Sequence, residues 1–138
     1  MLREAILCVD DEAIILLSIK QELKRHFGGR FLIETALDAA EASALVDELE
    51  TRDIRTVLVI SDWMMPGMRG DQFLVELHRR KPHIKTVIIT ALASEDSERG
   101  WKEAGLHACI RKPWRSTELY ATIEGCLASG GEADHGKE

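Results

Sequence analysis

Five short apolar runs rich in Val and Ile alternate along the chain with longer stretches whose apolar residues recur at helical spacing. This alternation predicts repeated strand and helix units. Most of the short runs lack the alternating polar positions of a half-exposed strand, which indicates a parallel sheet covered by helices on both faces. The predicted strands are Ala5–Val9, Phe31–Ala36, Val57–Ile60, Thr86–Thr90 and Ala108–Ile110.

The stretches between these strands carry helix signals at their ends as well as in their periodicity. Apolar residues recur every four positions from Ile15 to Phe27, and Gly28 follows as a stop signal. Asp38 can cap the second helix, with Glu41 completing a capping box. The predicted helices are Glu12–Phe27, Asp38–Leu49, Asp71–Arg80, Ser94–Ala104 and Ser116–Leu127.

The order of these elements predicts the domain organisation. Parallel strands joined by right-handed helical crossovers form an open, doubly wound α/β sheet. We expect residues 1–128 to form one such domain, with five strands and five helices. Residues 129–138 are Gly-rich, charged and without periodicity, which indicates a disordered tail or a truncated linker.

Composition narrows the class of protein. The 138 residues include 18 Lys and Arg against 24 Asp and Glu, a net charge of −6, and this acidic balance argues against a nucleic-acid partner. The apolar run Ala13–Leu17 is far shorter than the roughly 20 residues of a membrane-spanning helix, and no signal peptide is recognisable. Cys8, Cys109 and Cys126 are widely spaced, as is typical of reduced, packed thiols. We therefore expect a cytoplasmic domain with no membrane partner.

Polar residues follow four of the predicted strands where each strand ends: Asp10 and Asp11, Asp62, Thr90 and Lys112. Ligands of doubly wound sheets bind at this edge. If the first and third strands are neighbours, about 4.8 Å apart, three carboxylates share a small volume and need a compensating cation or raised pKa values. An open, oxygen-rich site suits Mg²⁺. Thr90 and Lys112 would complete a frame for a phosphoryl group on one of the aspartates.

Four strand-end motifs, taken together and in their order along the chain, resemble those of the receiver domain of bacterial two-component response regulators. The chemotaxis response regulator is a simple example of this family. The motifs are the pair Asp10-Asp11, the segment Ile60–Gly67, the pair Thr90-Ala91 and the step Lys112-Pro113. The resemblance implies a flavodoxin-like sheet with strand order 2-1-3-4-5. It also implies a signalling domain that is not an enzyme. Such a domain switches protein–protein interactions after phosphorylation by a sensor histidine kinase or a histidine phosphotransfer protein.

The resemblance implies a role for each motif residue. Asp62 matches the phosphoacceptor, Thr90 the switch hydroxyl and Lys112 the cation that pairs with the phosphoryl group. Ala91 completes the switch pair, and Pro113 matches a proline that follows a cis peptide bond. Phosphoryl transfer depends mainly on placement and charge neutralisation, which agrees with these roles.

The metal site is implied in the same way. Mg²⁺ would be held by the carboxylates of Asp10, Asp11 and Asp62 and by the backbone carbonyl of Met64. Asp11 alone, however, would equally well serve as a helix cap without binding metal.

Three positions depart from the family pattern. Cys109 stands where the family usually has an aromatic residue that changes rotamer with the switch hydroxyl, so we expect signalling to rely more on Thr90 and the segment after it. Met64 and Leu92 occupy the two positions that tune phosphoryl lifetime, and neither can orient an attacking water. We therefore expect the aspartyl phosphate to hydrolyse slowly compared with that of receivers that have polar residues at these two positions. A homodimer would use the face formed by residues 94–104, 108–110 and 116–127.

Other function classes are open at this stage. Haloacid-dehalogenase-like phosphatases also use a strand-end Asp with Mg²⁺, but their second Asp would fall at Met64. A flavodoxin-like cofactor binder would need a phosphate loop where Asp10, Asp11 and Glu12 repel a phosphate. The chain could also be the receiver part of a longer regulator or of a hybrid kinase.

Overall fold

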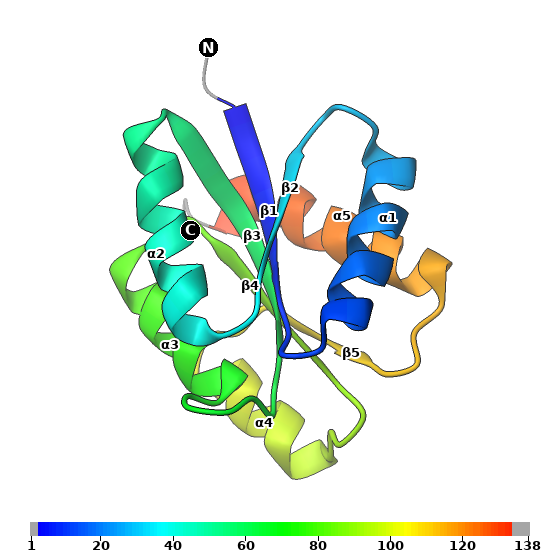
Figure 1. The fold of residues 1–138 in the computed structure, drawn as a ribbon. Coiled ribbons are helices and arrows are strands. Elements are labelled where there is room, and N and C mark those ends of the chain that lie inside the picture. The colour runs from blue at the N-terminus through cyan, green and yellow to red at the C-terminus, as the bar shows by residue number, and fades with distance from the viewer. Residues whose placement is uncertain (1–2, 134–138) are drawn as a thin grey trace.

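The computed structural model describes residues 3–133, in which strands and helices strictly alternate (Figure 1). The five strands pair in parallel as one sheet with the order β2-β1-β3-β4-β5, which confirms the predicted doubly wound topology. None of the helices within residues 3–133 is long and apolar enough to cross a membrane. The elements are β1 (Arg3–Val9), α1 (Ala13–Phe27), β2 (Leu32–Ala36), α2 (Ala39–Thr51), β3 (Ile54–Asp62), α3 (Gly70–Arg80), β4 (Lys85–Thr90), α4 (Glu95–Glu103), β5 (Ala108–Arg111) and α5 (Ser116–Ala133).

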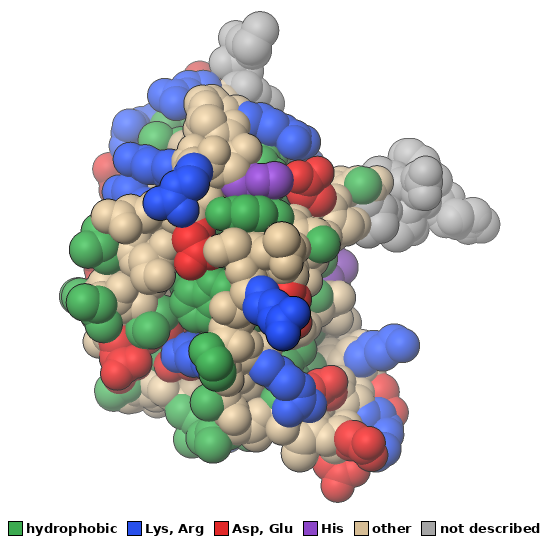
Figure 2. Space-filling model, turned by 90° about the vertical axis from the view of Figure 1, so that its right-hand side faces the viewer, with side chains coloured by type: hydrophobic (Ala, Val, Ile, Leu, Met, Phe, Trp, Pro, Cys, Tyr) green, Lys and Arg blue, Asp and Glu red, His purple; other side chains and the backbone are tan. Residues whose placement is uncertain are grey.

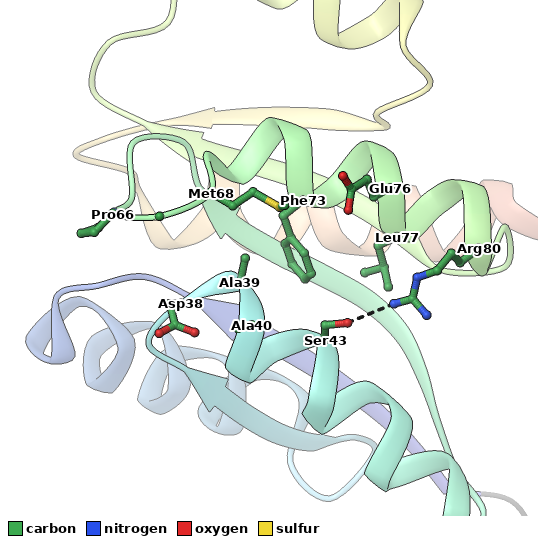
Figure 3. Close-up of a pocket in the computed structure, with 11 residues that line it drawn as sticks. Asp38, Ala39, Ala40, Ser43, Pro66, Met68, Phe73, Glu76, Leu77 and Arg80 are labelled. Atoms are coloured by element: carbon green, nitrogen blue, oxygen red, sulfur yellow. Dashed lines mark hydrogen bonds between the residues drawn. The ribbon is translucent and has the colours of Figure 1, made fainter.

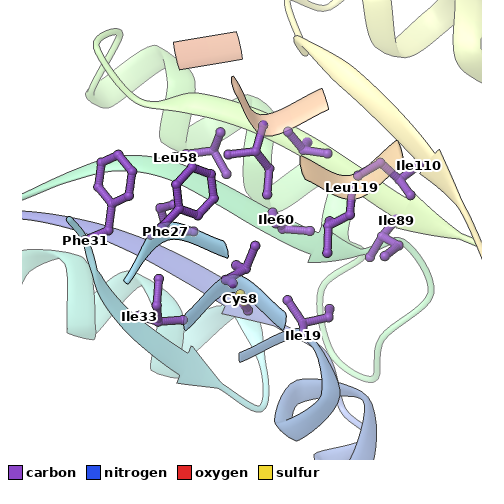
Figure 4. Close-up of a cluster of buried hydrophobic side chains, with 14 of the residues drawn as sticks. Cys8, Ile19, Phe27, Phe31, Ile33, Leu58, Ile60, Ile89, Ile110 and Leu119 are labelled. Atoms are coloured by element: carbon purple, nitrogen blue, oxygen red, sulfur yellow. The ribbon is translucent and has the colours of Figure 1, made fainter. Parts of the chain in front are cut away.

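Helices cover both faces of the sheet, with α1 and α5 on one side and α2, α3 and α4 on the other (Figure 1). Successive residues of a strand point to opposite faces, and β1 is apolar on both. Ile6 and Cys8 pack in the cluster under α1 and α5 (Figure 4), whereas Leu7 and Val9 pack under α2 and α3. Burial on both faces explains why the predicted strands read as unbroken apolar runs.

The helix starts differ in detail from the predicted capping. The Asp38 carboxylate accepts a hydrogen bond from the backbone N–H of Glu41 at 2.8 Å, as predicted. The Glu41 carboxylate, however, accepts from the backbone N–H of Leu37 rather than of Asp38. In α1, Leu16 is buried where Ile15 was expected to begin the buried face.

Several elements are longer than predicted by one or two residues at an end, and two elements, β3 and α5, are longer by five residues or more. β3 runs over Ile54–Asp62 instead of Val57–Ile60, because its first half alternates between buried and exposed positions and does not read as an apolar run. α5 continues to Ala133, so residues 129–133 are helical and not a disordered tail. The Gly130-Gly131 pair costs about 1 kcal/mol per glycine in a helix, which does not stop a helix that already gains one hydrogen bond per added residue. The remainder of the predicted tail, residues 134–138, lies outside the described residues.

Candidate functional site

The sheet brings the strand-end residues to one edge. Val9 pairs with Ser61 of β3, so Asp10 and Asp62 follow adjacent positions of neighbouring strands. Asp62 pairs in turn with Ile89 of β4, and Thr90 pairs with Arg111 of β5. The polar residues predicted from four separate parts of the chain therefore lie together at the carboxyl edge, the lower edge of the sheet in Figure 1.

Three carboxylates form a compact cluster at this edge. Asp10, Asp11 and Asp62 each offer an oxygen, and these oxygens all lie within 4.8 Å of one another. Asp10 and Asp62 are buried, whereas Asp11 is exposed. Asp10 Oδ1 accepts a hydrogen bond from the backbone N–H of Glu12 at 2.8 Å, and Glu12, the residue before α1, makes no side-chain cap. The capping interpretation of Asp11 is therefore wrong, and its carboxylate is available to the cluster.

Lys112 neutralises part of this charge. Its Nζ donates to Asp10 Oδ2 at 3.1 Å and to Asp62 Oδ1 at 3.2 Å. Burial by itself lowers the pKa of the Lys112 ammonium, but the hydrogen bonds and charges of the two carboxylates outweigh it, so its pKa is raised. Burial, followed by the charge of Asp10, raises the pKa of Asp62 in spite of Lys112. One ammonium thus compensates the three carboxylates only in part, and an oxygen-coordinated divalent cation fits the donor set.

Thr90 and the Lys112-Pro113 step occupy the places expected of them along this edge. Thr90 is buried, and its Oγ1 accepts a hydrogen bond from the backbone N–H of Leu92 at 3.1 Å. The backbone N–H of Lys112 donates to the Thr90 carbonyl at 2.9 Å, which links the ends of β4 and β5. The Lys112-Pro113 peptide bond is cis, as predicted. Ala91 is exposed beside Thr90.

The cysteines have packing environments. Burial raises the pKa of the Cys8 thiol to about 12, and burial, followed by the charge of Glu98, raises the pKa of Cys109 to about 11. Neither thiol is therefore a thiolate at neutral pH. Cys109 is half-buried against the cluster under α2, α3 and α4, which agrees with a small side chain that fills space.

Five large hydrophobic side chains are exposed in the described part of the chain: Ile14, Leu17, Leu37, Met64 and Leu92. Figure 2 shows hydrophobic side chains from the middle to the lower part of its left-hand side. Ile14 and Leu17 belong to α1, whereas Met64 and Leu92 each follow a strand-end residue of the site, Asp62 and Thr90, by two positions. Met64 and Leu92 therefore add apolar surface close to the acidic site.

A separate hollow of about 350 Å³ lies between α2 and α3 (Figure 3). Small residues of α2, Ala39 and Ala40, face Phe73 and Leu77 of α3 across it, and the side chains of Ser43 and Arg80 are hydrogen bonded at its end at 3.1 Å. None of the strand-end residues lines this hollow, so it is not part of the acidic site.

Sequence analysis missed two features beside Asp62. Gly70 begins α3 so close to the end of β3 that a Cβ on it would lie 1.8 Å from the Asp62 carbonyl oxygen. The Trp63 ring meets the Trp101 ring of α4 edge to face, with the centroids 5.0 Å apart. A glycine directly before the predicted helix start at Asp71 was a usable signal for the close approach. The tryptophan contact had no sequence signal, because the two residues lie on different elements.

A doubly wound parallel sheet in this strand order, with an acidic cluster and a lysine at its carboxyl edge, defines the class of flavodoxin-like signalling domains. Comparison with known proteins identifies the family. A sequence model of the response regulator receiver domain matches residues 6–124. The chain belongs to this family, as the strand-end motifs predicted, and it is a receiver domain of two-component response regulators. The match gives no support to the phosphatase alternative or to the cofactor-binding one.

Individual relatives agree with this assignment. Hydrogenase transcriptional regulatory protein HoxA of Cupriavidus necator is 32% identical over 91% of this chain and 24% of that protein. Phosphate regulon transcriptional regulatory protein PhoB of Pseudomonas aeruginosa is 29% identical over 97% of this chain and 56% of that protein. The crystal structure of a CheY-like receiver domain protein from Methanospirillum hungatei JF-1 has a TM-score of 0.80 at 30% identity, over 95% of this chain and 98% of that one. This chain thus spans about a quarter of the first relative and about half of the second.

Proposed function

We propose that Asp62 accepts a phosphoryl group from a histidine kinase or a histidine phosphotransfer protein, with Mg²⁺ bound beside it. The observation that carries this proposal is the cluster of three carboxylates that shares the Lys112 ammonium. Asp10, Asp11, Asp62 and the backbone carbonyl of Met64 would hold the ion. When bound, Mg²⁺ supplies positive charge for the transferring phosphoryl oxygens.

The residues of the chain provide the remaining chemistry. A carboxylate oxygen of Asp62 attacks the phosphorus, so that an O–P bond forms while the P–N bond to the donor imidazole breaks. The donor imidazole leaves with the electron pair of that bond, and the product is an aspartyl phosphate. Lys112 Nζ already lies 3.2 Å from Asp62 Oδ1, where it can pair with a phosphoryl oxygen as negative charge is added.

Thr90 is proposed as the switch. Its hydroxyl accepts from the Leu92 N–H, and it can donate its own proton to a phosphoryl oxygen on Asp62. Rotation toward Asp62 would break the bond to Leu92 and release the segment between β4 and α4. This movement would alter the surface formed by α4, β5 and α5, through which we propose that the domain forms homodimers.

Exposed apolar side chains support a protein partner at the acidic site. Met64 and Leu92 are exposed two residues after Asp62 and Thr90. A partner that presents a phosphohistidine from an apolar helical face would bury these two side chains. We propose that this occurs in the cytoplasm, with no nucleic acid bound by the receiver domain itself. The relatives that are longer than this chain are of two classes. HoxA and PhoB are transcriptional regulatory proteins, and hybrid signal transduction histidine kinase D of Dictyostelium discoideum is a kinase. If the chain is part of a longer protein, that protein would belong to one of these two classes.

Acetyl phosphate with Mg²⁺ tests the proposed function. We expect intact-mass analysis to show one phosphoryl group that is stable in acid and labile in base, and peptide mapping to place it on the segment ending β3. Chelation of Mg²⁺ by EDTA should prevent its formation, because Lys112 alone compensates the carboxylates only in part. Absence of any adduct, together with turnover of phosphate esters, would contradict the receiver mechanism.

The side chain of Met64 should determine how long the phosphoryl group persists. Met64 and Leu92 are exposed and offer no hydrogen bond to an attacking water. We expect Met64→Asn to shorten the phosphoryl lifetime by about tenfold, because a well-aligned polar group contributes about 10²-fold or more to such a step and the new side chain is only partly aligned. Decay of the adduct, followed by mass spectrometry after removal of acetyl phosphate, measures the effect. Leu17→Asn, which makes a similar change at an exposed position of α1, is the control and should leave the lifetime unchanged. A lifetime that is unchanged or longer in Met64→Asn would contradict the prediction.

A further inference from the structure

Trp63, the residue after the proposed phosphoacceptor, contacts helix α4, which lies two helices further along the chain than α2. Trp63 follows Asp62 directly, and its ring packs edge to face against Trp101 of α4, with an interplanar angle of 80°. Trp101 is buried and Trp63 is half-buried, so the contact packs against the cluster under α2, α3 and α4. Edge-to-face aromatic pairs have a preferred geometry, and displacing one ring shifts the favoured place of the other.

A carboxylate holds the second ring in place. Trp101 Nε1 donates to Asp71 Oδ2 at 3.1 Å, and Asp71 Oδ1 accepts from Arg69 Nε at 3.1 Å. Asp71 lies in the first turn of α3, whose first residue, Gly70, donates its backbone N–H to the Trp63 carbonyl at 2.7 Å. Three parts of the chain therefore contact one another pairwise. The segment after Asp62 contacts α4 through the two tryptophans, α4 contacts the start of α3 through Asp71, and the start of α3 contacts the segment after Asp62 through the backbone of Gly70.

Trp63 carries a buried polar group without a partner. Its Nε1 is buried and has no hydrogen-bond partner among residues 3–133. A buried donor without a partner is unfavourable compared with a position in which it meets water or an acceptor. The observed ring position therefore depends on packing, which includes the contact with Trp101. A displacement that brought the Trp63 N–H to water would recover a hydrogen bond.

An exposed ion pair also attaches α4. On its β5 side, Arg111 pairs with Glu98 and donates to the Ala93 carbonyl at 3.1 Å. The Arg111 and Glu98 side chains are 56% and 38% exposed, and exposed ion pairs contribute little to stability. The packed tryptophan contact is therefore firmer than this ion pair.

We propose that the Trp63–Trp101 contact, with Asp71 as a positioning residue for Trp101, transmits phosphorylation of Asp62 to α4. The proposal rests on the proposed function, because it needs a phosphoryl group on Asp62. Added charge and bulk at the end of β3 displace the Trp63 segment, and the paired ring carries the displacement to α4. Cys109 of β5 is too small to make an equivalent contact. The tryptophan route therefore adds to the movement of the β4–α4 segment that is proposed for Thr90.

Amide hydrogen exchange in α4 tests the coupling. In the wild type, phosphorylation by acetyl phosphate and Mg²⁺ should change the exchange rates of residues 95–103 by at least about fivefold. In Trp101→Leu, the phosphoryl adduct should form normally, but the ratio of rates with and without it should fall to about two or less. The remaining change comes from the β4–α4 segment that Thr90 releases. Trp101→Phe keeps an aromatic ring but loses the bond to Asp71 and part of the ring contact with Trp63, so it should fold and reduce the ratio at least about twofold. Arg99→Ala, which breaks an exposed pair with Asp96 in the same helix, is the control and should keep the wild-type ratio.

The outcomes separate the possible failures. A merely structural role for Trp101 would raise exchange equally in both states and leave the ratio unchanged, which would overturn the proposal. An adduct in the wild type without any change in α4 would overturn it as well. Absence of the adduct in the wild type would instead contradict the proposed function on which the coupling rests.

Discussion

Asp62→Asn should take up no phosphoryl group from acetyl phosphate, with a loss of at least about 100-fold in the rate of adduct formation. The amide oxygen is a much weaker nucleophile than the carboxylate, whereas its size and its ability to accept from Lys112 Nζ are retained. Intact-mass analysis over time measures the rate. Asp96→Asn makes the same chemical change at an exposed aspartate of α4 and should leave the rate unchanged. An adduct in Asp62→Asn at the wild-type level would place the acceptor elsewhere.

The same variant should not lose stability at neutral pH. Burial, followed by the charge of Asp10, raises the pKa of Asp62 above its usual value of 3.8, so the ionised carboxylate is less favourable in the folded than in the unfolded chain. This cost is fully present above the folded-state pKa and disappears as the pH falls below 3.8, where the carboxyl is protonated in both states. Without Mg²⁺, Asp62→Asn should therefore have an equal or higher Tm at pH 7, and the difference should shrink in acid. A lower Tm at pH 7 would show that the Lys112 pairing outweighs the burial cost.

Gly70→Ala should be the most destabilising single methyl addition near the site. The new Cβ would lie 1.8 Å from the Asp62 carbonyl oxygen and 2.7 Å from Ser61 Oγ, so the start of α3 or the end of β3 must move. Backbone displacement of this kind costs at least about 3 kcal/mol of unfolding free energy, which corresponds to a fall in Tm of roughly 10 °C for a domain of this size. Thermal unfolding followed by circular dichroism measures it.

A second glycine provides the matched control. Gly125 lies within α5, and a Cβ there would meet nothing within 4 Å. Gly125→Ala should therefore raise stability by about 0.5–1 kcal/mol, since alanine favours the helix and restricts the unfolded chain. Opposite signs for the two substitutions would confirm that steric contact with Asp62 decides the effect at Gly70. An unchanged Tm in Gly70→Ala would show that α3 can shift without cost.

Residue patterns predicted the number, order and type of the elements because burial on both faces of a parallel sheet leaves uninterrupted apolar runs. The patterns were wrong at two element ends. The start of β3 alternates between buried and exposed residues, so it was not recognised as part of a buried strand. α5 runs past its predicted end at Leu127 through Gly130 and Gly131, because a helix already formed tolerates unfavourable residues.

For the candidate site, the motif residues were found from the sequence because each follows a strand, and strand ends of a parallel sheet meet at one edge. The sequence did not predict which of these residues pair. Lys112 is hydrogen bonded to both Asp10 and Asp62, whereas Asp11 does not cap α1, and both facts depend on side-chain positions. The same holds for the contact of Trp63 with Trp101.

The amino-acid sequence by itself thus determined the fold class, the chemistry of the strand ends and the family to which the chain belongs. These depend on periodicity and on residue type, which are local properties. Only the tertiary structure decided which charges pair, which backbone groups touch and how the acidic site is joined to α4. Such contacts connect residues on different elements, and their energies depend on distance and burial that no local pattern records.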